Sequence, residues 1–364
     1  MRILLCGGGT AGHINPAIAI AEETLSRFPD AEVLFIGREG GNENKAITDA
    51  GFSLKTIKIM GLKRSLSLNN ILRIYTALQS VSAAKKIILD FKPDVILGTG
   101  GYVSWPVIFA GQSMNIPTAI HESNVVPGLT TRLLASRCTR VFVAREETKE
   151  YLPKRAKILA VGNPLRKGFL SISREQARRK LGIKDDEVLI LSFGGSIGAE
   201  KINKVIIDVI ENHSSKNAKV RHIHATGRRY YKQVNSSFKK EKDGCVILPY
   251  IDNMPCVLKA ADIVICRSGA MTISEIMAVG VASILIPSPN VSGNHQFLNA
   301  KYLSDKETAI MIEEKNLTSE QLINILFSLE IDKFDRKNRA KKIKALSTPN
   351  ASKTILDEMI LLKK

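Results

Sequence analysis

The sequence predicts an α/β protein of two domains, each built on a parallel β-sheet with helices on both faces. Short runs rich in Val, Ile and Leu alternate with helix-length segments along the whole chain. Strands that are apolar on both faces and separated by such segments are typical of doubly wound parallel sheets. The chain has 364 residues, which suits two domains of ordinary size. Its composition, 44% hydrophobic and 24% charged, is that of a protein with cores to bury.

The expected strands fall into two series that begin in the same way. The first series comprises residues 2–6, 32–37, 94–98, 117–120, 140–144 and 157–161. The second comprises residues 187–193, 219–225, 245–248, 262–266 and 282–286. In each series the first strand runs into a glycine-rich loop and then into a helix. For the first of these helices we expect Asn15 as N-cap and Pro16 at the first helical position.

A hinge is expected where glycine and proline break both periodicities, in Gly162-Asn163-Pro164-Leu165-Arg166. The predicted division is an N-terminal domain over residues 1–163 and a C-terminal domain over residues 164–340. The remaining residues, 341–364, are expected to form a helix that packs back on the N-terminal domain.

Composition excludes several classes of protein. No uninterrupted apolar run approaches the roughly 18 residues that span a bilayer, and the N-terminus lacks the apolar region of a signal peptide. The five cysteines are scattered and lack CxxC spacing, so we expect reduced thiols in a cytoplasmic protein. Aromatic residues make up only 5% of the chain, which argues against a stacking platform for single-stranded nucleic acid.

The formal net charge is +18, which predicts a polyanionic partner, either nucleic acid or anionic lipid. In the N-terminal half the basic excess is confined to residues 55–92, where eight cations accompany one acid. Apolar residues recur there at helical spacing, namely Ile71, Ile74, Tyr75 and Leu78. One interpretation is that this face packs on the sheet and the cations are solvated. We favour a face that rests on anionic phospholipid headgroups, because the excess charge is so localised.

The first glycine loop, Gly7-Gly8-Gly9-Thr10-Ala11-Gly12, has the GxGxxG form of a dinucleotide-binding turn. Dinucleotide-binding enzymes also need an acid at the end of the second strand. Here Gly37-Arg38-Glu39 puts a cation before the acid, and His13 directly follows the glycines. The alternative is that the glycines only let a helix approach a strand closely.

The loop Gly194-Gly195-Ser196-Ile197-Gly198-Ala199 has two interpretations. Together with Asp262 and His295 it matches the order of a hydrolase nucleophile, acid and base. The other interpretation is a phosphate cradle, in which the Ser196 hydroxyl and the amides of the next helix N-terminus face an anion. No GxxxxGK[ST] motif occurs, so the loop is not of the Walker type.

A third segment, Arg267-Ser268-Gly269-Ala270-Met271-Thr272-Ile273-Ser274-Glu275, follows the expected strand 262–266 and opens another helix. Its first-turn amides form a second possible anion site. Glu275 is placed to accept hydrogen bonds from a ribose diol. The alternative is that Thr272 and Glu275 form a capping box.

Seven motifs together resemble the MurG family of GT-B glycosyltransferases in identity and in order, over nearly the whole chain. They are Gly7-Gly8-Gly9-Thr10-Ala11-Gly12-His13, Gly100-Gly101-Tyr102-Val103-Ser104, His121-Glu122-Ser123-Asn124, Gly162-Asn163-Pro164-Leu165-Arg166, the loop from Gly194 to Ala199, the segment from Arg267 to Glu275, and His295-Gln296-Phe297-Leu298-Asn299-Ala300. The resemblance implies two Rossmann-like domains that face a cleft. It also implies that the C-terminal domain binds UDP-GlcNAc and that the N-terminal domain binds the acceptor lipid I.

The resemblance further implies which residues contact UDP-GlcNAc. They are Thr10, Ala11, Gly12 and Asn124 at the sugar end, Arg166 and Ser196 at the diphosphate, Ala270, Met271 and Thr272 at the leaving group, the backbone of Ile251 at uracil, Glu275 at the ribose and Gln296 at the GlcNAc hydroxyls. Three departures from the family pattern are Ala11 for the usual second glycine, His295 where some members carry glutamine, and Trp105 where glycine is common.

The implied reaction is inverting transfer of GlcNAc to the C4 hydroxyl of the N-acetylmuramoyl group of lipid I, which forms lipid II for peptidoglycan. No Asp-x-Asp motif follows a strand, so we expect neither a metal nor a cofactor. His13 is a candidate general base because imidazole titrates near neutrality. The alternative is that His13 only orients the acceptor. Glu122 is the second candidate for the general base. The resemblance also implies a peripheral enzyme on the cytoplasmic face of the bacterial membrane that binds no nucleic acid.

Four rival functions remain open from the sequence. A diacylglycerol glycosyltransferase and a non-hydrolysing UDP-GlcNAc 2-epimerase would have the same fold. A nucleic-acid-binding protein would explain the charge but none of the glycine loops. A scaffold for cell-wall assembly would tolerate loss of Glu275 and Gln296.

Overall fold

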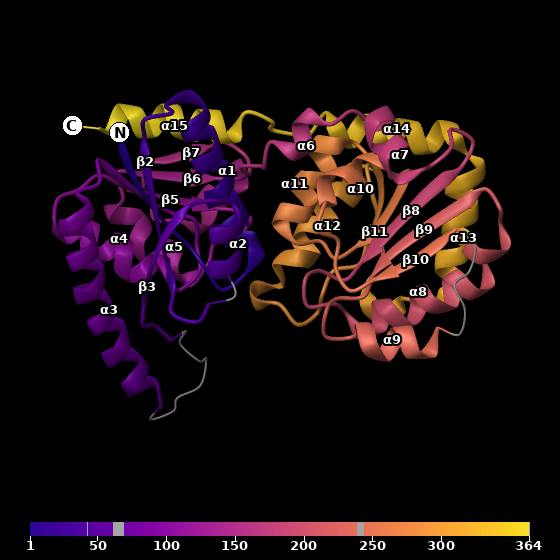
Figure 1. Ribbon diagram of the computed structural model, residues 1–364, viewed down its shortest axis with the longest axis horizontal. Coiled ribbons are helices and arrows are strands. Elements are labelled where there is room, and N and C mark those ends of the chain that lie inside the picture. Colours follow the sequence, from indigo (N-terminus) through magenta and orange to yellow (C-terminus); the bar gives the residue numbers. More distant parts are fainter. Residues whose placement is uncertain (42, 61–68, 239–243, 364) are drawn as a thin grey trace. The chain divides into compact units, whose positions relative to one another are not determined.

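The computed structural model describes residues 1–41, 43–60, 69–238 and 244–363. These residues form two compact units (Figure 1): unit 1 comprises residues 1–167 and 348–364, and unit 2 comprises residues 168–347. Each unit contains one parallel sheet with buried apolar clusters on both of its faces. The predicted class, two doubly wound α/β domains, is confirmed.

The described part of unit 1 has seven parallel strands in the order β3-β2-β1-β4-β5-β6-β7. The strands are β1 (Arg2–Cys6), β2 (Glu32–Arg38), β3 (Ser53–Ile57), β4 (Val95–Gly98), β5 (Thr118–Glu122), β6 (Arg140–Val143) and β7 (Ile158–Ala160). The helices are α1 (Ala11–Arg27), α2 (Glu43–Asp49), α3 (Asn69–Phe91), α4 (Ser104–Ser113), α5 (Leu129–Leu134) and α15 (Ala351–Leu362). The strand order reverses between β1 and β4, which is where ligands bind in open α/β sheets.

Unit 2 has six parallel strands in the order β10-β9-β8-β11-β12-β13, with the reversal between β8 and β11. The strands are β8 (Val188–Phe193), β9 (Val220–Ala225), β10 (Cys245–Leu248), β11 (Ile263–Cys266), β12 (Ala282–Leu285) and β13 (Ile310–Met311). The helices are α6 (Gly168–Ser171), α7 (Arg174–Leu181), α8 (Glu200–Asn212), α9 (Tyr231–Ser237), α10 (Met254–Ala260), α11 (Ala270–Val279), α12 (His295–Asp305), α13 (Ser319–Ile331) and α14 (Lys333–Lys344).

All eleven predicted strands are present, and the described residues contain two further strands that were not predicted. Both additional strands lie at a sheet edge: β3 borders unit 1 and β13 borders unit 2. An edge strand is partly solvated, so it needs no continuous apolar run. Ser53 to Ile57 accordingly carries three exposed residues and only one buried residue, and β13 has only two residues.

The packing of the central strands explains why apolar runs in the sequence predicted strands reliably. In β1, Leu4 and Cys6 pack into the cluster on one face, while Ile3 and Leu5 pack into the cluster on the other. Alternate side chains of a strand point to opposite faces, so a strand covered on both sides must be apolar at every position. All five cysteines are likewise buried.

The expected start of the first helix was wrong. Helix α1 begins at Ala11 with Thr10 as N-cap, and Pro16 lies inside it. The Thr10 carbonyl accepts hydrogen bonds from the amides of His13 and Ile14. Proline lacks the N–H that would bond to the carbonyl four residues earlier, so α1 lacks one backbone hydrogen bond in its second turn. His13 is therefore a first-turn residue and not part of a preceding loop.

The C-terminal segment is divided differently from the expectation of one helix over residues 341–364. Helix α14 ends at Lys344 within unit 2, and α15 begins at Ala351 within unit 1. Pro349 lies between them and disfavours helical backbone at the preceding residue. The first boundary between the units follows Lys167, a few residues beyond the expected 163.

Helix α15 packs against α1, and Figure 1 shows the two side by side. Ile355, Leu356 and Met359 are buried in the apolar cluster of β1 and α1. Two ion pairs flank this contact, Arg27–Asp357 at 2.6 Å and Arg140–Glu358 at 2.9 Å. Among the described residues, no helix is both long enough and apolar enough to cross a membrane.

Candidate active site

In unit 1 the candidate residues gather at the carboxyl ends of the central strands. Strands β1 and β4 are neighbours, with Cys6 opposite Gly98. The loop that carries Thr10 and the loop that begins at Thr99 therefore leave the sheet side by side. Strand β5 pairs with β4 on its other side, which adds the loop of Glu122 and Asn124 to the same edge. Ala11 is the first residue of helix α1, where the backbone has a negative φ and does not need glycine.

His13 is held at this edge by the loop after β4. Its carbonyl oxygen accepts a 2.6 Å hydrogen bond from the Thr99 hydroxyl. Gly100 has a φ of +104°, and a Cβ there would lie 2.6 Å from Nδ1 of the His13 ring. Only glycine combines that backbone angle with so close an approach. The imidazole is thus placed by packing against backbone, with Nδ1 buried, while the residue as a whole is partly exposed.

Glu122 is the most completely bonded carboxylate of the candidate residues. Its Oε1 accepts hydrogen bonds from the main-chain and side-chain amides of Asn124 at 3.0 and 3.2 Å. Its Oε2 accepts from the Gly128 amide at 3.0 Å and from the Thr131 hydroxyl at 2.7 Å. Glu122 is only 4% exposed. This geometry makes it a clamp that shapes the Asn124 loop and the start of α5.

Arg166 lies in unit 1, where its guanidinium contacts Glu22 of α1 with two nitrogens at 3.1 Å from the same carboxylate oxygen. The guanidinium remains about half exposed. Such an exposed ion pair is weak, so it does not prevent the arginine from binding an anion.

In unit 2 the loops after β8, β11 and β12 leave one edge of the sheet together. Phe193 at the end of β8 is opposite Cys266 of β11, and Cys266 is opposite Leu285 of β12. These loops line a pocket of about 810 Å³ that contains both Ser196 and Gln296. The structure therefore brings together two residues that were predicted for one ligand and that lie 100 positions apart.

The glycine loop of this pocket is fitted to the segment after β9. Gly198 has a φ of +91°, and a Cβ there would overlap the carbonyl oxygen of Thr226. The Asn203 side chain of α8 donates a 2.9 Å hydrogen bond to that same oxygen. Tyr230, which follows, lines the pocket.

Two pocket residues were missed from the sequence, Lys201 and Lys204 of α8. They lie within the first five residues of the helix that follows the glycine loop, where its N-terminal amides also favour an anion. Their position just after a glycine loop was the sequence feature that could have identified these two lysines as anion-binding candidates. Arg267 also lines the pocket, but it is bound to the Glu314 carboxylate and to the carbonyls of Ile286 and Pro287.

Gln296 is oriented by its surroundings at the start of α12. Its side-chain Oε1 accepts a 2.9 Å hydrogen bond from the Ser288 amide, and its carbonyl accepts one of 2.8 Å from the Ser268 hydroxyl. With the oxygen so occupied, the Nε2 amide is the end available to a ligand hydroxyl.

The capping-box interpretation of Thr272 and Glu275 was wrong. Helix α11 begins at Ala270 with Gly269 as N-cap, so Thr272 is a third-position residue that cannot cap. Glu275 is partly exposed as a residue, and its carboxyl group makes no hydrogen bond or ion pair within the described residues. Burial raises the pKa of this carboxyl to about 8. An unpartnered carboxyl of this kind is available to ligand hydroxyls.

The hydrolase interpretation also fails, because Asp262 lies at the opposite end of the sheet from Ser196. Asp262 directly precedes β11 and accepts a hydrogen bond from the Leu189 amide near the start of β8. Its carboxylate is bound by Arg174 at 2.8 Å and Arg178 at 2.9 Å. Ser196 follows the other end of β8.

Ile251 is 5% exposed and packs in the core of unit 2. Trp105 stacks on Phe109 within α4. In the described part of the chain, no three His, Cys, Asp or Glu side chains are grouped as metal ligands.

Comparison with known families decides the class of the protein. Residues 3–143 match the glycosyltransferase family 28 N-terminal domain, and residues 189–355 match the family 28 C-terminal domain. The chain belongs to glycosyltransferase family 28. Other family 28 glycosyltransferases align with this chain over nearly its full length.

One relative is the UDP-N-acetylglucosamine--N-acetylmuramyl-(pentapeptide) pyrophosphoryl-undecaprenol N-acetylglucosamine transferase of Acetivibrio thermocellus. It is 42% identical over 98% of this chain and 97% of the relative. The Bacillus subtilis protein of the same name is 37% identical over the full length of both chains. The crystal structure of Acinetobacter baumannii MurG is similar with a TM-score of 0.75 and 26% identity, over 99% of each chain. A UDP-GlcNAc 2-epimerase from Neisseria meningitidis, with a TM-score of 0.68, covers 99% of this chain and 100% of its own, but its 16% identity shows a shared fold alone.

Proposed function

We propose that this family 28 glycosyltransferase transfers GlcNAc from UDP-GlcNAc to the C4 hydroxyl of the N-acetylmuramoyl group of lipid I, with inversion, and so forms lipid II for peptidoglycan. The observation that carries the proposal is the unit 2 pocket that joins Ser196 and Gln296. Relatives that span the whole chain bear the name of this transferase.

In the proposed site, unit 2 binds the donor. The amides at the N-terminus of α8 and the Ser196 hydroxyl line the pocket and are proposed to face the diphosphate, with Lys201 and Lys204 adding positive charge. The amides at the N-terminus of α11, which is not part of that lining, are proposed to face it as well. As UDP leaves, negative charge builds up on the diphosphate, and fixed amide dipoles stabilise it without reorganisation. Ala270, Met271 and Thr272 supply the first-turn amides of α11. The main chain of Ile251 pairs with uracil, and Arg166 completes the diphosphate site.

Unit 1 presents the acceptor and activates it. Thr10, Ala11, Gly12 and Asn124 are proposed to contact the sugar end of the donor. His13 is the proposed general base, because its ring is fixed by Gly100 and the residue is partly exposed at the carboxyl edge of the sheet. We propose that Glu122, whose oxygens already accept four hydrogen bonds, acts by shaping the Asn124 loop.

The experiment that tests the function is UDP release from UDP-GlcNAc, with and without a lipid I analogue. Release that depends on this acceptor is the expected result. Release with a diacylglycerol analogue instead would identify a different lipid acceptor. Conversion of the donor with no acceptor present would identify an epimerase.

At pH 9, above the folded pKa of about 8 at which Glu275 ionises, Glu275→Gln should lower the affinity for UDP at least tenfold, because a ribose-binding carboxylate is replaced by an amide that has one acceptor oxygen. Isothermal titration with UDP measures the loss. The matched control is 2′,3′-dideoxy-UDP, which lacks the hydroxyls and should bind the two proteins equally. An equal loss for both ligands would remove Glu275 from the ribose.

The same substitution should change the dependence of stability on pH. The folded pKa of Glu275 is raised to about 8 from an ordinary value of 4.5. Between these values the unfolded chain has lost a proton that the folded protein keeps, so this group makes stability fall as pH rises from 4.5 to 8. The free energy of unfolding of Glu275→Gln, minus that of the unmodified protein, should therefore be more positive at pH 8.5 than at pH 5. Denaturant melts of both proteins at the two pH values measure this difference.

Gln296→Ala should relax the choice between UDP-GlcNAc and UDP-GalNAc at least tenfold in the ratio of kcat/KM. A site that donates a hydrogen bond to a sugar hydroxyl discriminates strongly against the epimer that leaves it unpaired. Steady-state rates with both donors provide the measurement. An unchanged ratio would assign epimer selection to other residues.

The acceptor is proposed to be held in the inner leaflet, so the enzyme is proposed to bind the cytoplasmic membrane surface peripherally through residues 55–92. Lys63 and Arg64 lie outside the described residues, as do Leu66 and Leu68, and the side chains of 69–75 are not described. The described Leu78 is exposed. Each cation near an anionic surface contributes about 1 kcal/mol.

Charge reversal at Lys63, Arg64 and Arg73 should therefore weaken binding to anionic vesicles and slow the reaction with membrane-embedded acceptor. Reaction with a short-chain soluble acceptor should be unaffected. Vesicle sedimentation and the two rates are the measurements. Unchanged vesicle binding would mean that these cations are merely solvated.

A further inference from the structure

Three large apolar side chains protrude where α13 meets α14 in unit 2. Phe327 and Ile331 are four residues apart on α13 and are 58% and 66% exposed. Phe334 follows at the start of α14 and, at 81%, is the most exposed large apolar side chain of the described residues. One residue, Asp332, separates the two helices. Exposed apolar clusters of this kind mark interaction sites.

Lysines surround this cluster on α14. Arg336 and Ile343, seven residues apart, mark the buried side of the helix. Phe334, Lys337 and Lys341 follow one another at helical spacings of three and four, so they share the opposite, outward face. Lys333 stands beside them at the first position. We call the surface formed by Phe327, Ile331, Phe334, Lys333, Lys337 and Lys341 the α13–α14 corner.

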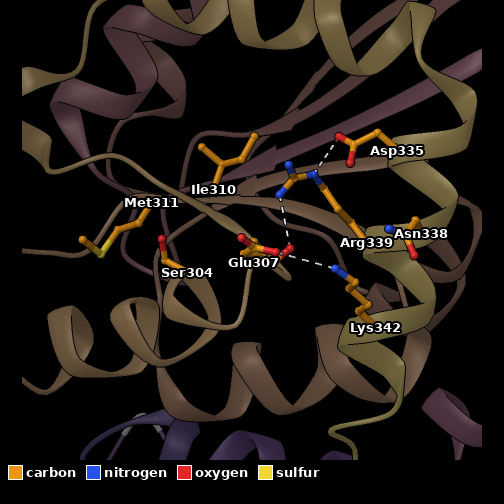
Figure 2. A pocket seen from close by; sticks show the side chains of 9 residues that line it. Ser304, Glu307, Ile310, Met311, Asp335, Asn338, Arg339 and Lys342 are labelled. Carbon is orange, nitrogen blue, oxygen red and sulfur yellow. Dashed lines mark hydrogen bonds and ion pairs between the residues drawn. The ribbon is translucent and has the colours of Figure 1, made fainter.

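The charges on the other flank of α14 are already neutralised. Figure 2 shows Arg339 bound to Asp335 and to the Glu307 carbonyl, with Lys342 directed at the Glu307 carboxylate. The Asp332 carboxylate caps α14 by accepting the Asp335 amide at 2.8 Å. By contrast, the three lysines of the corner make no ion pair within the described part of the chain. Their charge is therefore available to an external anion.

We propose that the α13–α14 corner is a membrane-contacting element of unit 2, in which Phe334 and its two apolar neighbours enter the headgroup region of an anionic phospholipid surface while the lysines contact the phosphates. The inference rests on the proposed function, because a lipid-linked acceptor brings the enzyme to a bilayer. It adds to residues 55–92 a second contact, on the donor-binding unit.

Two observations favour lipid over an acidic protein partner. The apolar side chains protrude from a helix corner, as in interfacial helices that bury aromatic and aliphatic residues among headgroups. The cations are all lysines, whose long flexible stems let the ammonium groups stay at the phosphate level while the apolar groups go deeper.

The decisive test places a fluorescent reporter at the corner. The chain has one tryptophan, Trp105, so Phe334→Trp in a Trp105→Phe background provides a single probe. With vesicles of phosphatidylcholine and phosphatidylglycerol, the emission should shift to the blue and be quenched by brominated lipid. Pure phosphatidylcholine vesicles should give neither change. Binding to anionic vesicles without a shift would place the contact elsewhere and overturn the proposal.

A charge-reversal pair tests the lysines with the full-length protein. Lys333→Glu, Lys337→Glu and Lys341→Glu together should weaken partitioning to anionic vesicles at least tenfold. Lys180→Glu, Lys184→Glu and Lys216→Glu make the same change in net charge at exposed positions elsewhere in unit 2, and they should weaken it much less. If both triple variants lost the same amount of vesicle binding, the effect would come from net charge alone, and the proposal would be overturned. Tight binding to soluble polyglutamate with no vesicle binding would assign the corner to an acidic protein.

Failure of this inference is distinguishable from failure of the proposed function. Vesicle binding needs no acceptor and no turnover, so it stands or falls without the transferase assay. Conversely, UDP release with a short-chain soluble acceptor needs no membrane, and it should be unaltered by the three corner lysine substitutions.

Discussion

Replacing His13 with alanine should lower kcat about 10²-fold or more and change KM for either substrate far less. A general base acts only as the acceptor hydroxyl attacks, so its loss removes stabilisation of the transition state and not of the bound substrates. The ring lies in the first turn of α1 against the Gly100 backbone, so alanine should remove it without disturbing the helix. Steady-state rates with a soluble acceptor measure the effect.

Asparagine at the same position separates a base from an orienting group. His13→Asn keeps a hydrogen-bonding side chain but cannot take up a proton near neutral pH. If His13 is the base, this variant should be as slow as the alanine variant, and the acidic limb of the pH–rate profile should disappear in both. Recovery of most of the rate by asparagine would show that His13 only orients the acceptor.

Glu122→Gln is the control for the competing assignment. Glutamine cannot accept all four hydrogen bonds that the carboxylate accepts from Asn124, Gly128 and Thr131. We expect a lower Tm and weaker substrate binding, with the acidic limb retained. If the acidic limb disappeared in the Glu122 variant but not in the His13 variants, Glu122 would be the general base and His13 would not.

Sequence alone could predict most of the sheet architecture because buried parallel strands must be apolar on both faces. The edge strands β3 and β13 escaped because they are not so constrained. The predicted start of α1 was wrong because proline is typical of the first helical position, and Pro16 was therefore placed there. The close approach of Gly100 to His13 could not be predicted, because it depends on the order of the strands in the sheet.

The candidate site could be predicted as a set of residue types but not as a geometry. Ser196 and Gln296 were predicted for one ligand, and the β8–β11–β12 order brings their loops together. The hydrogen bonds that commit Glu122 to its loop depend on how the chain returns after β5, which no local pattern reveals. Likewise, the hydrolase alternative could be rejected only from strand register, which separates Asp262 from Ser196.

The second large effect expected is a loss of stability in mild acid, caused by two histidines inside unit 2. His222 and His224 of β9 are both completely buried. The Ser192 hydroxyl lies 2.8 Å from Nε2 of His222 and 2.8 Å from Nδ1 of His224. Nδ1 of His224 is also 3.2 Å from the Ser192 carbonyl, and Nδ1 of His222 is 3.0 Å from the Ser214 hydroxyl.

This chain of contacts fits two neutral rings. Nδ1 of His224 carries its proton and donates to Ser192, the Ser192 hydroxyl donates to His222, and Nδ1 of His222 donates to Ser214. A second proton on His224 would go to Nε2, which is buried with no hydrogen-bond partner in the described structure. Burial accordingly lowers the pKa of His224 to about 4 and that of His222 well below its usual 6.5.

The sign of the effect follows from the direction of these shifts. Below pH 6.5 the unfolded chain binds protons at both histidines that the folded protein does not bind, so stability falls as pH drops from 6.5 toward 4. Each histidine contributes a slope of about 1.4 kcal/mol per pH unit within that window.

The substitution His224→Asn should make the protein less sensitive to acid while it weakens the protein at neutral pH. Asparagine places an amide N–H where Nδ1 stands and so keeps the bond to Ser192, but it does not titrate, and it leaves part of the ring volume empty. Urea unfolding at pH 7 and pH 5 should show a smaller stability difference than in the unmodified protein, by roughly 1.4 kcal/mol for each pH unit below 6.5. The m-value should be the same for both proteins, which checks that the variant unfolds from the same compact state. Equal pH slopes in the two proteins would mean that acid lability arises elsewhere, and that the ring at position 224 accepts a proton in the folded state.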